Sequence, residues 1–179
     1  MGIVVARNGE NMQACTIIIF GATGDLSRKK LLPALYHLDA ENRLSEETKI
    51  ICMGRGDSTQ QAWHDNVTSY VSPKARDGVC DDLLAKFLDR VSYFKCDLTQ
   101  AASYEELNAQ LMDADNNFSS NIVFYLSISP SLFGVVGDQL AAVGLNKEDN
   151  GYRHLVVEKP FGYDQKSAAE LEQVLRKNF

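Results

Sequence analysis

The stretch Thr16-Ile-Ile-Ile-Phe-Gly-Ala-Thr-Gly-Asp-Leu-Ser-Arg-Lys-Lys30 decides the fold of this chain. Its residues Ile17 to Phe20 are apolar and mostly β-branched, a pattern typical of a buried parallel strand. Gly21 and Gly24 follow at once, and a helical pattern begins beside them. Such a corner leaves backbone N–H groups at a helix N-terminus, where the helix dipole also favours an anion. Taken alone, it fits a phosphate site and an ordinary turn equally well, because glycine simply permits the turn.

The size and composition of the chain are those of one ordinary globular domain. It has 179 residues, of which 45% are hydrophobic and 23% charged, and its formal net charge is −6. The negative charge argues against a broad nucleic-acid surface, and no apolar run in the sequence reaches the length of a membrane span. We expect residues 1–14 to form a flexible arm, because this segment is polar apart from the short apolar run Ile3 to Ala6 and shows no signal-peptide pattern. Residues 15–179 are expected to form one domain.

The four cysteines are Cys15, Cys52, Cys80 and Cys96. None forms a C-x-x-C pair, and the chain has only three histidines, so we expect no metal site. Three of the four lie in or beside apolar runs that read as buried strands, where a free thiol behaves as a small hydrophobe. This usage indicates a reducing, cytoplasmic setting.

Strands and helices alternate along the chain. The hydrophobic pattern predicts strands at Cys15–Phe20, Lys49–Gly54, Val91–Cys96, Asn121–Leu126 and Arg153–Glu158. It predicts helices at Asp25–Leu38, Gln60–Val71, Asp81–Leu88, Ser103–Met112 and about Ser131–Val143, with a last helix near the C-terminus. The alternation predicts an α/β fold, namely a doubly wound Rossmann-like parallel sheet with helices on both faces.

Two helices carry local signals that the structure can test. Pro33 lies inside the first predicted helix, and we expect it to kink the helix or to remove a backbone hydrogen bond. Ser103 is expected to cap the fourth helix, with Glu106 at capping-box spacing; Ser167 and Glu170 have the same spacing in the last helix.

Ligands of open parallel sheets bind beyond the carboxyl ends of the strands, so the residues just after each strand are the candidates. After the first strand, the spacing Gly21-x-x-Gly24 is a relaxed version of the dinucleotide-binding turn G-x-G-x-x-G, and the chain contains no P-loop motif. Thr23 has a hydroxyl able to bond a phosphate, although ordinary turn chemistry also explains a threonine there.

The second strand is followed by Gly54-Arg55-Gly56-Asp57. In dinucleotide-binding sheets an acidic residue near this point binds the ribose of NAD, whereas an arginine accommodates the 2′-phosphate of NADP. Arg55 comes first and suits a phosphate, and the cluster Arg28 to Lys30 adds positive charge nearby. NADP is therefore the preferred cofactor, and NAD is the alternative because Asp57 could bind its ribose.

The ends of the other strands supply further candidates. Asp97 and Leu98 follow the third strand, near the expected adenine position, although an aspartate there also suits an Asx-turn. Tyr125 lies at the end of the fourth strand, where it could pack on the cofactor or in the core. Lys159, between Glu158 and Pro160, follows the fifth strand and could hold a substrate hydroxyl or phosphate.

Together these segments resemble the N-terminal coenzyme domain of the glucose-6-phosphate dehydrogenases. The matching pieces, in the family's order and spacing, are residues 20–36, Gly54-Arg55, Asp97-Leu98, Tyr125–Pro130 and Glu158–Gly162. The resemblance implies hydride transfer from glucose 6-phosphate to NADP, giving 6-phosphogluconolactone, in the pentose phosphate pathway.

The resemblance also implies roles for individual residues. The pyrophosphate and adjoining ribose would be held by the turn Gly21, Ala22, Thr23, Gly24, Asp25 and Leu26. Arg55, helped by Thr23, would hold the 2′-phosphate. Asp97, Leu98 and Tyr125 would lie along the cofactor, and Lys159 would contact both cofactor and sugar.

One part of the family's pattern is expected beyond Phe179, the last residue of this sequence. It comprises the family's Arg-Ile-Asp-His-Tyr-Leu-Gly-Lys segment and, further on, its general-base histidine; His37, His64 and His154 match neither. We therefore expect no catalytic residue in these 179 residues, and a chain that alone binds NADP without turning over glucose 6-phosphate. We also expect it to be a monomer, whereas the full-length family is homo-oligomeric.

Two other interpretations stay open. The chain could be a stand-alone dinucleotide-binding or sensor module without chemistry, although Lys159 and Pro160 favour an enzyme. It could also belong to another class of NAD(P) oxidoreductase or to the sugar-nucleotide epimerases, which use a Tyr-x-x-x-Lys motif.

Overall fold

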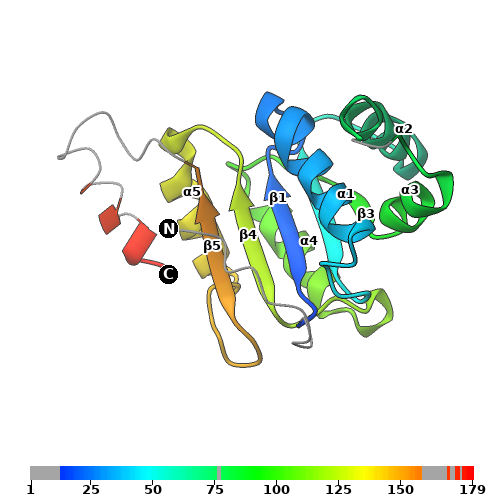
Figure 1. The fold of residues 1–179 in the computed structure, drawn as a ribbon. Helices are drawn as coiled ribbons and strands as arrows, with labels where there is room; N and C mark the ends of the chain where they lie inside the picture. The colour runs from blue at the N-terminus through cyan, green and yellow to red at the C-terminus, as the bar shows by residue number, and fades with distance from the viewer. Residues whose placement is uncertain (1–12, 76–77, 159–168, 170–171, 174) are drawn as a thin grey trace.

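A parallel sheet forms the centre of the molecule. The computed structural model describes residues 13–75, 78–158, 169, 172–173 and 175–179. The strands are β1 (Thr16–Phe20), β2 (Lys49–Gly54), β3 (Val91–Lys95), β4 (Ile122–Leu126) and β5 (Arg153–Val157), in the order β3-β2-β1-β4-β5 (Figure 1). Ile18 of β1 lies opposite Ile51 of β2 and Phe124 of β4. The direction of winding reverses between β1 and β4, and open sheets bind ligands at such a switch point.

Helices cover both faces of this sheet (Figure 1). One face packs against α1 (Leu32–Ala40), α2 (Gln60–Val71) and α3 (Asp81–Leu88). The other packs against α4 (Ala101–Met112) and α5 (Phe133–Ala142). Short helical turns occur at η1 (Ser27–Leu31), η2 (Ser72–Lys74), η3 (Ala114–Asn116) and η4 (Pro130–Leu132). The expected doubly wound α/β fold is confirmed.

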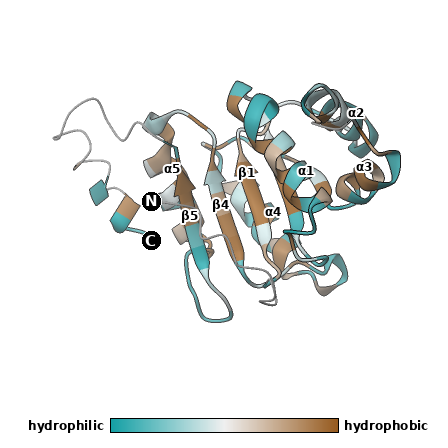
Figure 2. Ribbon diagram, viewed as in Figure 1, coloured by the Kyte–Doolittle hydropathy of each residue, from teal (hydrophilic) through white to brown (hydrophobic). Residues whose placement is uncertain are grey.

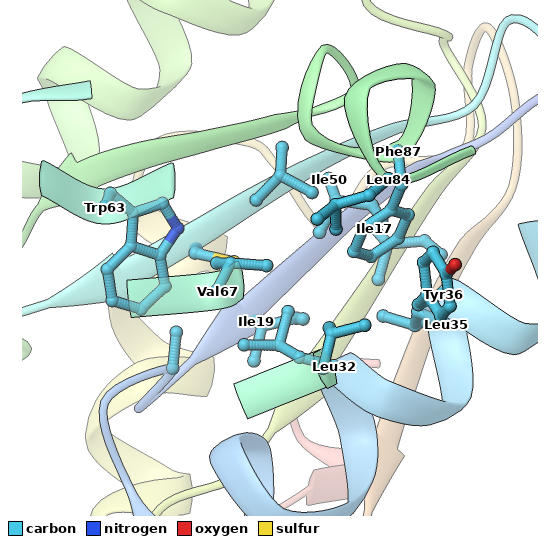
Figure 3. Close-up of a cluster of buried hydrophobic side chains, with 14 residues drawn as sticks. Ile17, Ile19, Leu32, Leu35, Tyr36, Ile50, Trp63, Val67, Leu84 and Phe87 are labelled. Atoms are coloured by element: carbon cyan, nitrogen blue, oxygen red, sulfur yellow. The ribbon is translucent and has the colours of Figure 1, made fainter. Parts of the chain in front are cut away.

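The core is divided by the sheet because successive strand side chains point to opposite faces. Ile17 and Ile19 pack with Leu32 and Trp63 on the α1 side (Figure 3). Ile18 and Phe20 contribute to the cluster on the α5 side. Each such side chain, once fully buried, stabilises the fold by about 1.5–3 kcal/mol. The apolar strands accordingly form the interior, with the hydrophilic segments outside (Figure 2).

Pro33 is accommodated by a widened turn of its helix. The turn η1 is π-helical, and the Leu32 N–H donates to the carbonyl of Ser27, five residues back. Pro33 then occupies the first turn of α1, where a missing N–H costs little. The expected disturbance therefore takes the form of one π-turn just before the proline.

The capping role predicted for Ser103 is wrong. Helix α4 begins at Ala101, and its N-cap residue, Gln100, makes no side-chain cap. The Ser103 hydroxyl lies within the first turn and accepts the N–H of Asp97 at 3.3 Å. A serine hydroxyl so close to a loop readily bonds the loop backbone in place of the helix end.

Several sequence predictions concern segments that the structure describes only partly. Residues 1–12 of the expected arm, Lys159 with Pro160, and the cap at Ser167 and Glu170 lie outside the described residues. All four cysteines are free; Cys52 and Cys96 are buried as expected, while Cys80 is exposed. Burial raises the pKa of Cys52 to about 12. In the described part of the chain, no helix has the length and apolar character of a membrane span.

Candidate functional site

The turn after β1 is held tightly between the ends of β2 and β4. The Ala22 N–H donates to the Met53 carbonyl at 2.9 Å, and the Gly24 N–H donates to the Gly21 carbonyl at 2.9 Å. Gly21 has a φ of +79°, and a Cβ on it would lie 2.4 Å from the carbonyl oxygen of Ser127. Only glycine fits this backbone conformation and this close approach.

A helix N-terminus follows this turn directly. Its first i→i−4 hydrogen bond runs from the Arg28 N–H to the Gly24 carbonyl at 3.0 Å. The N–H groups of Asp25 and Leu26 therefore have no acceptor within the helix. Thr23 and Asp25 are exposed, so the turn is open to a ligand. Unpaired donors at a helix N-terminus are suited to a phosphate.

The basic cluster beside the turn is partly neutralised by its own helix. Asp25 accepts from Arg28 at 2.5 Å and from Lys29 at 2.7 Å, and these donors lower the pKa of its carboxyl group. The Arg28 guanidinium also lies over the ring of Tyr70, 5.9 Å from its centre. Lys30 is exposed. The positive potential at the turn is thus weaker than three adjacent cations suggest.

The end of β2 brings Arg55 and Thr23 to the same edge of the sheet. A Cβ on Gly54 would lie 3.1 Å from the methyl carbon of Thr23, so the two segments are in contact. Arg55 comes next and is exposed. Asp57 instead forms an ion pair with Lys95 at 2.6 Å. Of the two charged residues that follow β2, the arginine is the one left for a ligand.

Asp97, the aspartate predicted at this edge, lies two residues after the end of β3. The Asp97 carboxylate accepts the Thr99 N–H at 3.0 Å and its hydroxyl at 2.8 Å, which is the Asx-turn considered in the sequence analysis. These two hydrogen bonds, with a smaller contribution from Arg55, hold the Asp97 pKa below its usual range. The Leu98 carbonyl accepts the hydroxyl of Tyr104 at 3.0 Å.

Tyr125 joins the ends of β4 and β5. Its hydroxyl donates to the carboxylate of Glu158. Burial, and then this hydrogen bond, raise the pKa of the phenol. Tyr125 is therefore at the expected edge, partly buried beside the α1-side cluster. Lys159, the next residue after Glu158, is outside the described residues.

The histidines lie away from this edge. His37 contacts a backbone carbonyl in η2, and His64 contacts the carbonyl of Val91, the first residue of β3. His154 lies early in β5 and stacks on Tyr152 at 4.3 Å between ring centres. Within the described residues, no three His, Cys, Asp or Glu side chains gather in a way that could hold a metal ion.

Phe179 packs on the α5 side of the sheet. Its ring meets that of Phe124 in β4 edge-on, with 5.8 Å between ring centres, and it adjoins the α5-side cluster. The side chain of Tyr125, the next residue of β4, packs on the opposite face. Phe179 thus has a packing role in the core, away from the candidate residues. The expectation that the family's general base lies beyond Phe179 stays a prediction.

The chain contains one pair with Tyr-x-x-x-Lys spacing, Tyr70 and Lys74. Tyr70 packs against the α1-side core beneath Arg28, and Lys74 is exposed in η2. The two are split between the end of α2 and the following turn η2.

Two serines at this edge were not predicted from the sequence. Ser27 is completely buried, and its hydroxyl contacts both the Gly21 carbonyl and the Ser127 hydroxyl. The two serines are 100 positions apart. No periodicity or motif pairs residues at such a separation, which is why sequence reasoning missed them.

A doubly wound parallel sheet with this glycine turn, this helix N-terminus and an arginine after the second strand defines a dinucleotide-binding domain of the Rossmann class. A family model described as the NAD binding domain of glucose-6-phosphate dehydrogenase matches residues 18–179. The chain belongs to this family.

Relatives of the chain are named glucose-6-phosphate 1-dehydrogenases. It is 34% identical over 167 residues to the glucose-6-phosphate 1-dehydrogenase of Aggregatibacter actinomycetemcomitans, covering 92% of this chain and 33% of that protein. The identity to the Bacillus subtilis enzyme is 34% over 165 residues, covering 91% and 32%. The chain thus spans about a third of the length of these relatives.

Solved structures agree with this assignment. The glucose-6-phosphate 1-dehydrogenase of Mycobacterium avium has a TM-score of 0.81 at 31% identity, covering 93% of this chain and 34% of that chain. A glucose-6-phosphate dehydrogenase in complex with its substrate glucose-6-phosphate has a TM-score of 0.81 at 33% identity, covering 94% and 35%.

Proposed function

We propose that this chain is the NADP-binding part of a glucose-6-phosphate dehydrogenase. The whole enzyme would oxidise glucose 6-phosphate to 6-phosphogluconolactone and pass the hydride to NADP. Family membership supports the reaction, and the relatives' greater length agrees with a chain that supplies the coenzyme-binding third of the enzyme.

The residues at the carboxyl edge fit a dinucleotide. In this proposal the turn from Gly21 to Leu26 holds the pyrophosphate with its unpaired N–H groups, and Arg55 with Thr23 holds the 2′-phosphate. Asp97, Leu98 and Tyr125 lie along the cofactor. Lys159, outside the described residues, would contact both cofactor and sugar.

One observation favours NADP over NAD. Asp57, the residue that could bind the ribose of NAD, is paired with Lys95 at 2.6 Å, whereas Arg55 is exposed at the strand end. An exposed guanidinium at this strand end is suited to the 2′-phosphate of NADP, whereas the ribose of NAD is bound there by an acidic residue. Arg55 is therefore the proposed determinant of cofactor choice.

The chain by itself is proposed to bind the coenzyme without oxidising the sugar. Proton abstraction from the sugar hydroxyl needs a base placed within hydrogen-bond reach. The three histidines contact other parts of the molecule, as described above. Glucose 6-phosphate is the proposed substrate of the whole enzyme. The cytoplasmic setting and the monomeric state of this chain remain predictions.

Titration of NADP and NAD into the wild-type chain and into Arg55→Ala, followed by calorimetry, tests this proposal. A hydrogen-bonded ion pair with the 2′-phosphate contributes about 1.5–3 kcal/mol, so Arg55→Ala should weaken NADP binding roughly 10–100-fold and leave NAD unchanged. Adding glucose 6-phosphate to the NADP-loaded chain should produce no NADPH absorbance.

Arg43→Ala is the matched control for this titration. Arg43 is also exposed, but it pairs with Glu41 at 3.2 Å in the loop that leads into β2, at the opposite edge of the sheet. This variant should bind NADP like the wild type. An equal loss of NADP and NAD in Arg55→Ala would remove Arg55 from the 2′-phosphate role. A wild-type chain that binds neither cofactor would refute the proposed function.

A further inference from the structure

Ser27 is a completely buried polar side chain beside the glycine turn. Its Oγ lies 3.2 Å from the Gly21 carbonyl oxygen and 3.0 Å from the Oγ of Ser127. Three segments meet at this hydroxyl: the end of β1, the first turn of the following helix, and the residue after β4. A buried hydroxyl needs such partners, because leaving it unpaired costs free energy.

The Ser27 hydroxyl is the donor in both of these contacts. Because this hydroxyl has one proton, it shares that proton between the Gly21 carbonyl oxygen and the Ser127 Oγ. That carbonyl also accepts the Gly24 N–H at 2.9 Å. With two internal donors on it, the carbonyl oxygen is kept from facing a phosphate bound at the turn.

The backbone of the β4 end approaches the same point. The Ser127 N–H donates to the Phe20 carbonyl at 3.0 Å, and the Ser127 carbonyl oxygen leaves no room for a side chain on Gly21. This junction lies between β1 and β4, the switch point of the sheet. Dinucleotides cross doubly wound sheets at that point.

We propose that Ser27 and Ser127 are a positioning pair for the dinucleotide. Their hydrogen bonds fix the turn from Gly21 to Gly24 against the end of β4, in the conformation that presents its N–H groups to the pyrophosphate. Ser27 acts through the turn and does not touch the ligand, because its side chain is fully buried. This inference rests on the proposed dinucleotide binding.

The test compares two ligands in the 179-residue chain. NADP contains the pyrophosphate, whereas adenosine 2′-monophosphate contains only the part expected at Arg55. In Ser27→Ala and in Ser127→Ala, the Kd for NADP should rise about 3–10-fold, the scale of one neutral hydrogen bond, and the Kd for adenosine 2′-monophosphate should stay unchanged. The Kd for NADP of the double variant should not exceed that of the single variant with the higher Kd, because the two hydroxyls act together.

Two further variants separate positioning from general stability. Ser127→Thr keeps the hydroxyl and should retain wild-type affinity. Thr16→Val removes another fully buried hydroxyl, which bonds the Ser119 carbonyl at 3.1 Å at the opposite end of β1. It should lower the melting temperature without changing the Kd for NADP. If Ser27→Ala does not fold, the comparison of the two ligands is made with Ser127→Ala alone, because Ser127 is partly exposed.

Three results would overturn the positioning role. They are an unchanged Kd for NADP in the alanine variants, a parallel loss of both ligands, or an equal loss in Thr16→Val. A wild-type chain that fails to bind NADP would refute the proposed function instead, so the two failures can be told apart.

Discussion

The two edges of the sheet use arginine in opposite ways. At the amino edge, Arg90 is 6% exposed, lies 3.2 Å from the Asp39 carboxylate and donates to the Ser45 carbonyl at 2.6 Å. At the carboxyl edge, Arg55 is exposed, beside a turn whose first helical N–H groups have no acceptor in the helix. The buried arginine stabilises the fold, whereas the exposed one is open to the solvent at the edge proposed for the coenzyme.

A hollow surface alone does not identify the binding edge. A cavity of about 700 Å³ lies at the amino edge, with Gln13, Asp39, Asn42, Glu46, Lys86 and Arg90 among its lining residues. The buried charges in it are already paired with each other. Among the described residues, helix N–H groups that have no acceptor within their helix, rather than empty volume, therefore distinguish the carboxyl edge.

Breaking the ion pair at the amino edge should produce the largest effect. Asp39→Ala leaves the buried guanidinium of Arg90 without its carboxylate, which should lower the free energy of unfolding by about 3–5 kcal/mol in urea denaturation. The Kd for NADP of the folded protein should not change. Glu46→Ala, which removes the exposed pair with Lys86, is the control and should unfold like the wild type. Loss of NADP affinity in Asp39→Ala would contradict the separation of the two edges.

Gly21→Ala should have the next largest effect, now at the carboxyl edge. The positive φ costs about 1–2 kcal/mol for any L-residue with a Cβ, and the contact with Ser127 adds to this. We expect the free energy of unfolding to fall by more than about 2 kcal/mol and the Kd for NADP to rise at least tenfold. Gly144→Ala is the control, since Gly144 has a φ of +77° and open space around it. Equal NADP affinities in the two variants would show that the turn geometry does not matter.

The smallest effect concerns the acid limit of stability. The pKa of Asp97 lies below its ordinary value of 3.8 because Thr99 donates two hydrogen bonds to the carboxylate. The ionised form therefore stabilises the fold above pH 3.8, and this contribution is lost as the pH falls through the folded pKa. An NMR titration should show the Asp97 pKa rising in Thr99→Val, which removes one donor. An unchanged value would exclude the hydroxyl as a cause.

The fold could be predicted largely from local signals in the sequence. The bounds of β2, α2 and α3 agree with the prediction, because Gly54 ends β2, Pro73 follows α2 and Gly78 precedes α3. Helix α4 begins before its supposed cap, since Ser103 bonds the preceding loop. The π-turn before Pro33 depends on how the whole helix packs, and the sequence pattern predicted only some disturbance there.

The candidate site could be predicted only where it is local. The glycine turn is continuous in the sequence, and Arg55 follows a recognisable strand. The pairing of Asp25 with Arg28 and Lys29 follows helical spacing and could have been foreseen. Contacts such as Asp57 with Lys95 join residues far apart in the sequence, and only the folded sheet determines them.

The dependence of the glycine turn on Ser127 has a consequence for biosynthesis. All residues of the turn have been synthesised once residue 30 has been added. However, β1 pairs with β4, which places Thr16 opposite Ile122, so this part of the sheet forms much later. Such long-range pairing forms slowly compared with local structure. A growing polypeptide on the ribosome should therefore gain coenzyme affinity only after residue 127 has emerged. From then on, the coenzyme would bind and stabilise only those chains in which β1 has paired with β4. Coenzyme binding would thus favour correctly folded molecules during synthesis.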